Sequence, residues 1–118
     1  MAKKIMVVDD DPNIVTYITT ILEDAGYETC SAAEGGDAAY RILEECKPDL
    51  ITLDLDMPGE WGPRFYRRFS KKPEFKDIPV IVVSGLSGIT HAVNTAVAVI
   101  KKPFEPEDLL EIVRKTIG

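Results

Sequence analysis

Side chains that can bind a cation and a phosphoryl group stand at the ends of four short apolar runs of this sequence. The set comprises Asp9, Asp10 and Asp11, then Asp54 and Asp56, then Ser84, and last Lys102. Carboxylates that converge repel one another unless a proton or a cation neutralises them. Mg²⁺ takes oxygen ligands and commonly binds one or two carboxylates together with a phosphate oxygen. These residue types therefore suit a magnesium site that handles a phosphoryl group, with an ammonium and a hydroxyl contacting its oxygens.

The apolar runs are predicted to be the strands of one parallel sheet. Runs rich in β-branched residues alternate with amphipathic stretches of about ten to fifteen residues, which is typical of a parallel sheet with helices on both faces. The predicted strands span 4–8, 28–32, 50–53, 80–83 and 97–100, with the second and the last at the sheet edges. All strands of such a sheet point the same way, and ligands bind beyond their carboxyl ends. If the strand order is 2-1-3-4-5, Asp9, Asp10 and Asp54 converge there.

Five amphipathic stretches are predicted to be helices. The first begins at Pro12 after the N-cap residue Asp11, carries its apolar side chains at intervals of three and four residues, Tyr17 among them, and ends at Gly26. The others lie at about 37–46, around Phe65 and Phe69, at 87–94, where only a short helix fits, and after Pro106. The third helix also has a basic face, interpreted as solvated, which comprises Arg64, Arg67, Arg68, Lys71 and Lys72.

Length, charge and composition limit the class of protein. The chain has 118 residues and a net charge of −6, which fits a single domain over 1–118. The acidic balance argues against direct binding of nucleic acid, which depends mostly on lysine and arginine. No apolar run approaches the roughly 20 residues that span a membrane, and the N-terminal region lacks the features of a signal peptide. Cys30 and Cys46 form no CxxC pair, so they are expected to be reduced thiols in a cytoplasmic protein.

The motifs VVDDDP, LDLDMPG, VSG and KKPF, at the predicted strand ends, resemble those of the receiver domain of two-component response regulators. Each motif alone is weak, but the order and position of all of them match over nearly the whole chain, from about residue 3 to residue 117. The resemblance implies a flavodoxin-like, doubly wound α/β fold with strand order 2-1-3-4-5. It also implies a protein that is not an enzyme toward other substrates and that catalyses only its own phosphoryl transfer and dephosphorylation.

The resemblance implies which residue accepts the phosphoryl group and which residues bind the metal. Asp54 is the phosphoacceptor, and its donor is a sensor histidine kinase, a phosphotransfer protein or a small acyl phosphate. Mg²⁺ is held by the carboxylates of Asp10 and Asp54, by the backbone carbonyl of Asp56 and, through a water molecule, by Asp9.

The resemblance also implies how the phosphorylated state is recognised and transmitted. Lys102 pairs with the acceptor site, and Ser84 moves onto the phosphoryl group once it has formed. The Lys102–Pro103 peptide bond is expected to be cis. The output is a switch in protein–protein contacts, while the downstream partner and the formation of a homodimer stay open.

Two of the departures from the family pattern bear on the output surface. Val99 stands where many members carry an aromatic residue whose rotamer follows the switch, and a β-branched side chain cannot swing in the same way. The 18 positions from Ser84 to Lys102 are about one helical turn fewer than is usual for the family, which shortens the helix at 87–94. Both departures concern the output surface rather than phosphoryl transfer.

Simpler interpretations compete with these roles. Asp10 and Asp11 could be helix-capping acids, Ser84 could bond only to backbone, and Lys101 is an alternative to Lys102. At the level of function, the main alternative is a pseudo-receiver that binds a protein partner without phosphorylation. A second is a small phosphohydrolase that uses the DxD motif at 54–56, although its place in the middle of the chain does not fit that class.

Overall fold

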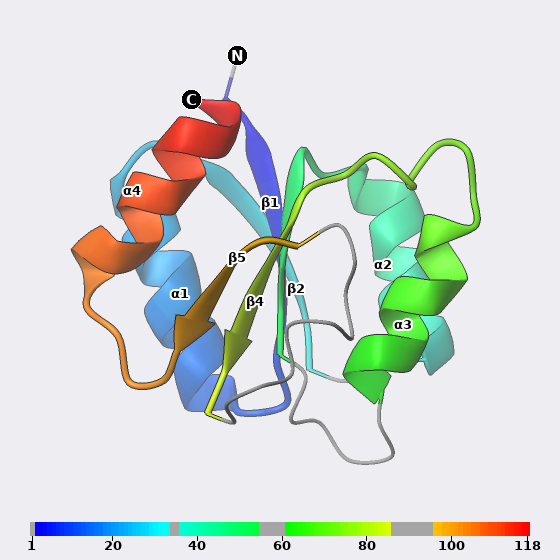
Figure 1. The fold of residues 1–118 in the computed structure, drawn as a ribbon, viewed down its shortest axis with the longest axis horizontal. Coiled ribbons are helices and arrows are strands. Elements are labelled where there is room, and N and C mark those ends of the chain that lie inside the picture. Colours follow the sequence, from blue (N-terminus) through cyan, green and yellow to red (C-terminus); the bar gives the residue numbers. More distant parts are fainter. Residues whose placement is uncertain (1, 34–35, 55–60, 86–95) are drawn as a thin grey trace.

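The structure is a computed structural model that describes residues 2–33, 36–54, 61–85 and 96–118. Its elements are, in chain order, β1 (Lys4–Val8), α1 (Pro12–Asp24), β2 (Glu28–Ala32), α2 (Gly36–Cys46), β3 (Leu50–Leu53), α3 (Trp61–Ser70), β4 (Val80–Ser84), β5 (Ala96–Lys101) and α4 (Pro106–Ile117). All neighbouring strands pair in parallel, and their order is β2-β1-β3-β4-β5 (Figure 1). The predicted doubly wound α/β class, strand order and edge strands are therefore confirmed.

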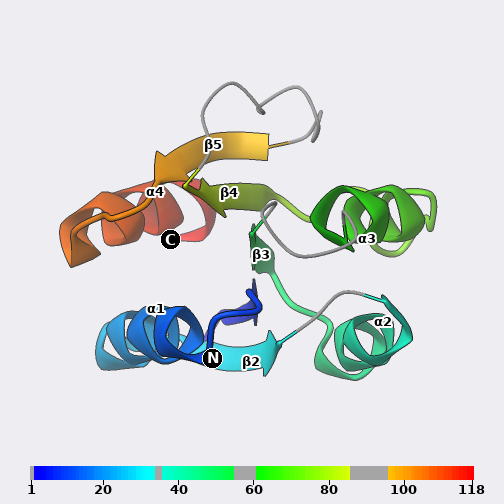
Figure 2. The same ribbon diagram turned by 90° about the horizontal axis from the view of Figure 1, so that it is seen from below.

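Helices cover both faces of the sheet. Figure 2 shows α1 and α4 against one face and α2 and α3 against the other. Side chains alternate along β1, so Ile5 and Val7 pack on the α1 and α4 side, whereas Met6 and Val8 pack on the α2 and α3 side. Strands β3 and β4 are buried along their whole length, which explains why their sequences are almost continuously apolar. Among the described residues, none of the helices has both the length and the apolar character that a membrane span requires.

Helix α1 begins and ends where the sequence predicts. The Asp11 side chain accepts a hydrogen bond from the Asn13 backbone N–H, and Pro12 occupies the first helical position. Gly26 follows the helix with φ of 96°, a conformation that glycine adopts more readily than other residues. Tyr17 follows the apolar spacing of this helix, but the residue is 39% exposed.

The remaining elements differ from the predicted ranges mainly at their ends. β4 includes Ser84, and β5 extends by one residue in each direction to Ala96 and Lys101. Helix α3 buries Phe65 and Phe69 as expected, but it ends at Ser70, so the last two lysines of the predicted basic face follow the helix rather than lie on it. The short helix expected at 87–94 lies outside the described residues.

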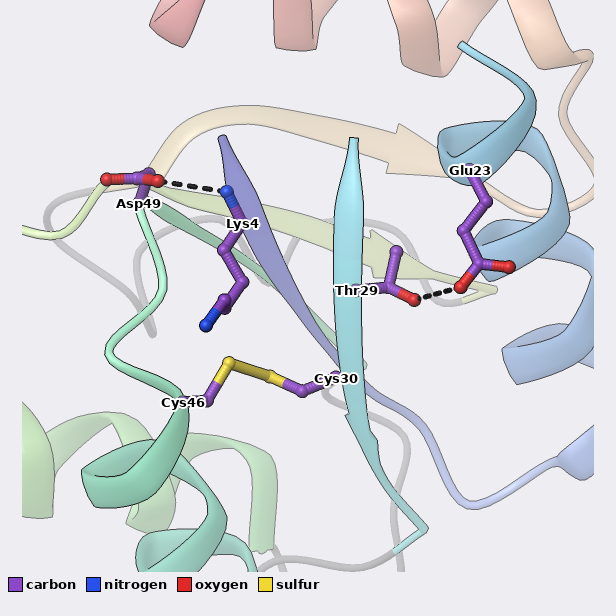
Figure 3. The surroundings of a disulfide bond; sticks show 6 residues. All are labelled: Lys4, Glu23, Thr29, Cys30, Cys46 and Asp49. Carbon is purple, nitrogen blue, oxygen red and sulfur yellow. Dashed lines mark hydrogen bonds between the residues drawn. A yellow bond between two sulfur atoms is a disulfide. The ribbon is translucent and has the colours of Figure 1, made fainter. Parts of the chain in front are cut away.

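The two cysteines are bonded to each other, so the prediction of reduced thiols is wrong for this structure. Cys30, in edge strand β2, forms a disulfide with Cys46, the last residue of α2 (Figure 3). The Cα atoms are 6.6 Å apart, within the range that a disulfide spans. The sequence spacing of 16 gave no sign of this contact. The contact arises because the chain folds back after β2, so that helix α2 packs against this strand.

Reduction of this disulfide is expected to lower the free energy of unfolding by about 3 kcal/mol, since a bond that closes a loop of about 15 residues restricts the unfolded chain by that amount. The measurement is denaturant unfolding with and without a reductant. The double variant Cys30→Ala with Cys46→Ala is the control, because its stability should not respond to the reductant. Equal stability of the oxidised and reduced native chain would contradict the prediction.

Candidate functional site

Two carboxylates are buried side by side at the carboxyl ends of β1 and β3. These strands are neighbours with Val8 opposite Leu53, so Asp9 and Asp54 are the first residues after each strand. The Asp54 backbone N–H donates to the Val8 carbonyl at 2.9 Å, which continues the ladder to the site. Asp9 is 1% exposed and Asp54 is 2% exposed. Ionised carboxylates at this depth require positive partners, because burial removes the water that would solvate them.

Lys102 supplies a positive charge to both carboxylates. Its Nζ lies 2.9 Å from Oδ2 of Asp9 and 3.6 Å from Oδ2 of Asp54. The Lys102 backbone N–H donates to the Ser84 carbonyl at 2.9 Å, which fixes the start of the side chain at the end of β4. Lys101 is paired opposite Ser84 in the sheet and is exposed. Of the two candidate lysines, the structure therefore brings Lys102 to the carboxylates.

Ser84 completes the row of strand-end residues. It is the last residue of β4 and is fully buried. The peptide bond between Lys102 and Pro103 is cis, as expected. The sheet thus brings Asp9, Asp54, Ser84 and Lys102 to one edge, as the predicted order of parallel strands requires.

An acidic cluster at this edge could hold a metal ion. Asp9, Asp10 and Asp54 each offer a carboxylate oxygen, and these oxygens lie within 4.8 Å of one another. Asp10 is exposed, so the cluster is open to solvent on that side. Asp9 also accepts a hydrogen bond from the Asp11 backbone N–H at 2.9 Å, which orients its carboxylate. Clustered carboxylate oxygens are the donor set that Mg²⁺ prefers, so these residues fit that ion. Asp56, the remaining predicted ligand, lies outside the described residues.

The basic face of α3 is not wholly a solvated surface. Arg68 forms an ion pair with Asp37 of α2 at 2.6 Å, and its guanidinium lies 4.2 Å from the centre of the Tyr40 ring. These contacts join α3 to α2, so Arg68 has a packing role that the charge pattern did not predict. Arg64 and Arg67 are exposed.

Two residues near the site were missed as candidates from the sequence. Tyr17 of α1 donates its hydroxyl to the backbone carbonyl of Phe104, two residues after Lys102. Thr52 of β3, two residues before Asp54, is 1% exposed. Thr52 had a signal in the sequence, since it is the one hydroxyl residue in a predicted strand that is otherwise apolar. No feature of the sequence predicted the contact between Tyr17 and Phe104, because it depends on how the helices pack.

Replacing Thr52 with valine is expected to raise the free energy of unfolding by about 1 kcal/mol. Its Oγ1 has no hydrogen-bond partner among the described residues, and an unpaired buried hydroxyl costs about 1–3 kcal/mol. Valine has nearly the same shape and needs no partner. Denaturant unfolding measures the change. The control is Thr29→Val in β2, which should show no gain because the Thr29 hydroxyl donates to Glu23 at 2.6 Å. A less stable Thr52→Val variant would contradict the prediction.

The comparisons with known proteins agree on one family. A family model described as the response regulator receiver domain matches residues 5–114. Protein Rrf1 from Nitratidesulfovibrio vulgaris is 37% identical over 118 residues, which is 100% of this chain and 85% of that protein.

Two of the solved structures that match this fold are response regulators. The chemotaxis response regulator CheY4 of Vibrio cholerae matches with a TM-score of 0.89 at 26% identity, over 99% of this chain and 100% of that one. The response regulator TrrA from Thermotoga maritima, solved in complex with Mg²⁺ and BeF, matches with a TM-score of 0.85 at 32% identity, over 98% and 99% of the two chains. Similarity to these proteins extends over nearly the full length of the sequence.

Proposed function

Because this chain belongs to the response regulator receiver domain family, we propose that Asp54 accepts a phosphoryl group and that its phosphorylation switches contacts with other proteins. Receiver domains are signalling modules rather than classical enzymes, and they act with histidine kinases or phosphotransfer proteins. The observation that carries the proposal is the position of Asp54. Its buried carboxylate lies among two further carboxylates and the Lys102 ammonium, at the edge of the sheet where ligands bind.

The acceptor chemistry follows from the residues of the site. A carboxylate oxygen of Asp54 attacks phosphorus and forms an O–P bond. The bond from phosphorus to the donor breaks, and the departing histidine nitrogen or acyl oxygen takes the electron pair. Lys102 holds a positive charge 3.6 Å from Asp54, so it is placed to stabilise negative charge that develops on the phosphoryl oxygens. Ser84 is proposed to donate its hydroxyl to one of these oxygens after transfer, and hydrolysis of the product returns the domain to its starting state.

Magnesium fits the acidic cluster of this site. Asp10 and Asp54 would bind the ion directly, with the backbone carbonyl of Asp56 and, through a water molecule, Asp9. When bound, Mg²⁺ neutralises charge on the acceptor carboxylate and on the incoming phosphoryl oxygens. The chain's own contribution is to hold the carboxylates together without the ion, and the Lys102 ammonium offsets part of their repulsion.

The proposed partners are a sensor histidine kinase or a phosphotransfer protein as the donor, and a downstream protein as the target. We propose a cytoplasmic location, where such donors act. The chain's charge of −6 also favours a protein target over direct binding to nucleic acid.

The test is the intact mass of the chain after incubation with Mg²⁺ and a small acyl phosphate. We expect the addition of one phosphoryl group, and its loss when a chelator removes the metal. Absence of the adduct in a chain that is folded and binds Mg²⁺, with a purified histidine kinase also tried as donor, would favour a constitutive protein-binding module. Steady turnover of a generic phosphate ester would instead indicate a phosphohydrolase.

A further inference from the structure

Tyr17 links α1 to the segment that carries Lys102. Its hydroxyl donates to the Phe104 backbone carbonyl at 2.9 Å, and the two rings are in contact with centroids 5.5 Å apart. Since Phe104 is two residues after Lys102, we propose that Tyr17 is a positioning residue for phosphoryl transfer to Asp54. It would hold the 102–104 segment so that the Lys102 ammonium stays at the acceptor site. This role rests on the proposed function. Tyr17 is not among the site residues expected from the sequence.

The Lys102 side chain depends on backbone anchors for its position. It must reach from the end of β5 to two buried carboxylates, and its Nζ is 2.9 Å from Asp9 but 3.6 Å from Asp54. On one side, its own backbone N–H is held by the Ser84 carbonyl. On the other side, the Phe104 carbonyl is held by Tyr17. A small shift of this segment would change the distance from the ammonium to Asp54 and with it the charge stabilisation during transfer.

The segment borders a hollow on the side of Tyr17, although the Phe104 side chain itself is buried in the core. This hollow of about 380 Å³ is lined by Ile14, Tyr17, Lys102, Pro103 and Phe104. Packing alone would therefore restrain the segment less on this side, whereas a directional hydrogen bond fixes the carbonyl. Tyr17 is 39% exposed, so its burial contributes less to the core than that of fully buried residues such as Leu22. A role in positioning accounts better for its hydroxyl than a role in core packing.

Tyr17→Phe tests the proposal because it removes the hydroxyl and keeps the ring. The rate of phosphoryl incorporation is measured over a range of acyl phosphate concentrations at saturating Mg²⁺. We expect a maximal rate about fivefold lower, as for the loss of one hydrogen bond, with the half-saturating donor concentration unchanged. Tyr27→Phe is the matched control. Tyr27 precedes β2, at the opposite end of the sheet from the site, so its variant should react at the native rate.

A double-variant cycle shows whether Tyr17 acts through Lys102. In the Lys102→Ala background, adding Tyr17→Phe should cause no further loss of rate, because the group that Tyr17 positions is gone. The same fivefold loss in that background would overturn the proposal, since Tyr17 would then act by another route. Equal rates for the native chain and Tyr17→Phe would overturn it as well.

A second measurement does not require phosphorylation. The Lys102 side chain is 20% exposed in the ion pair, so its acetylation by acetic anhydride should be slow, and Tyr17→Phe should speed it by a factor similar to the loss of transfer rate. Lys101, identified in the same peptide map, should react at an unchanged rate. An unchanged rate at Lys102 would contradict the positioning role. A native chain that accepts no phosphate but shows the predicted change at Lys102 would refute the proposed function and leave the positioning contact intact.

Discussion

Replacing Asp54 with asparagine is expected to abolish incorporation of a phosphoryl group from an acyl phosphate. Asparagine fills nearly the same volume in this buried position, but its neutral amide lacks the anionic oxygen that attacks phosphorus. It also removes a carboxylate from the proposed metal cluster. Intact mass after incubation with Mg²⁺ measures the result, and we expect the unmodified mass even after long incubation.

The control for this variant is Asp24→Asn. Asp24 is an exposed carboxylate at the last residue of α1, so its loss should leave incorporation unchanged. Circular dichroism establishes that both variants are folded. Incorporation of one phosphoryl group by Asp54→Asn, at the native yield, would show that another carboxylate is the acceptor. Peptide mapping would then identify it, with Asp9 and Asp10 as the nearest alternatives.

Replacing Lys102 with alanine is expected to lower the rate of phosphoryl incorporation by about 10²–10³-fold. Loss of a preorganised donor that stabilises developing negative charge has an effect of this order in other active sites. The effect should be large here because the ammonium contacts two carboxylates that are 1% and 2% exposed, where water cannot replace it well. The measurement is the time course of intact mass at saturating acyl phosphate and Mg²⁺.

The chain supplies a matched control for this variant in the preceding residue. Lys101→Ala removes the same charge from an exposed position of β5 and should react within about twofold of the native rate, because an exposed charge is screened by water and salt. Equal losses in both variants would indicate that only the overall charge matters. A native rate in Lys102→Ala would remove Lys102 from the proposed mechanism.

Output from the proposed phosphorylated state is a separate question in this chain. Val99 of β5 is 38% exposed, and its β-branched side chain has a stiff first torsion. Rotation of a large ring at this position cannot report the state of Asp54. We therefore expect the signal to pass through shifts of backbone, for which the 102–104 segment between the site and α4 is well placed.

The strands of the sheet, and most of the residues that gather at its edge, could be predicted from sequence patterns. Short apolar runs and the helical spacing of three to four residues depend on neighbours within one element, so the strands were predicted to within one residue at each end and the start of α1 at Pro12 was predicted correctly. Parallel strands end at one edge, which is enough to bring Asp9, Asp54, Ser84 and Lys102 together once the order is known. The sequence pattern also favoured Lys102 over Lys101.

Contacts between residues of different elements became clear only from the fold. Cys30 and Cys46 are paired because α2 folds back over β2, and the hydroxyl of Tyr17 reaches a carbonyl 87 residues away because α1 packs beside the start of α4. The Lys102 ammonium also lies closer to Asp9 than to Asp54, a difference that no sequence pattern indicated. Such contacts depend on the rotation and offset of whole helices against the sheet, which many distant side chains fix together. Local periodicity carries no information on these quantities.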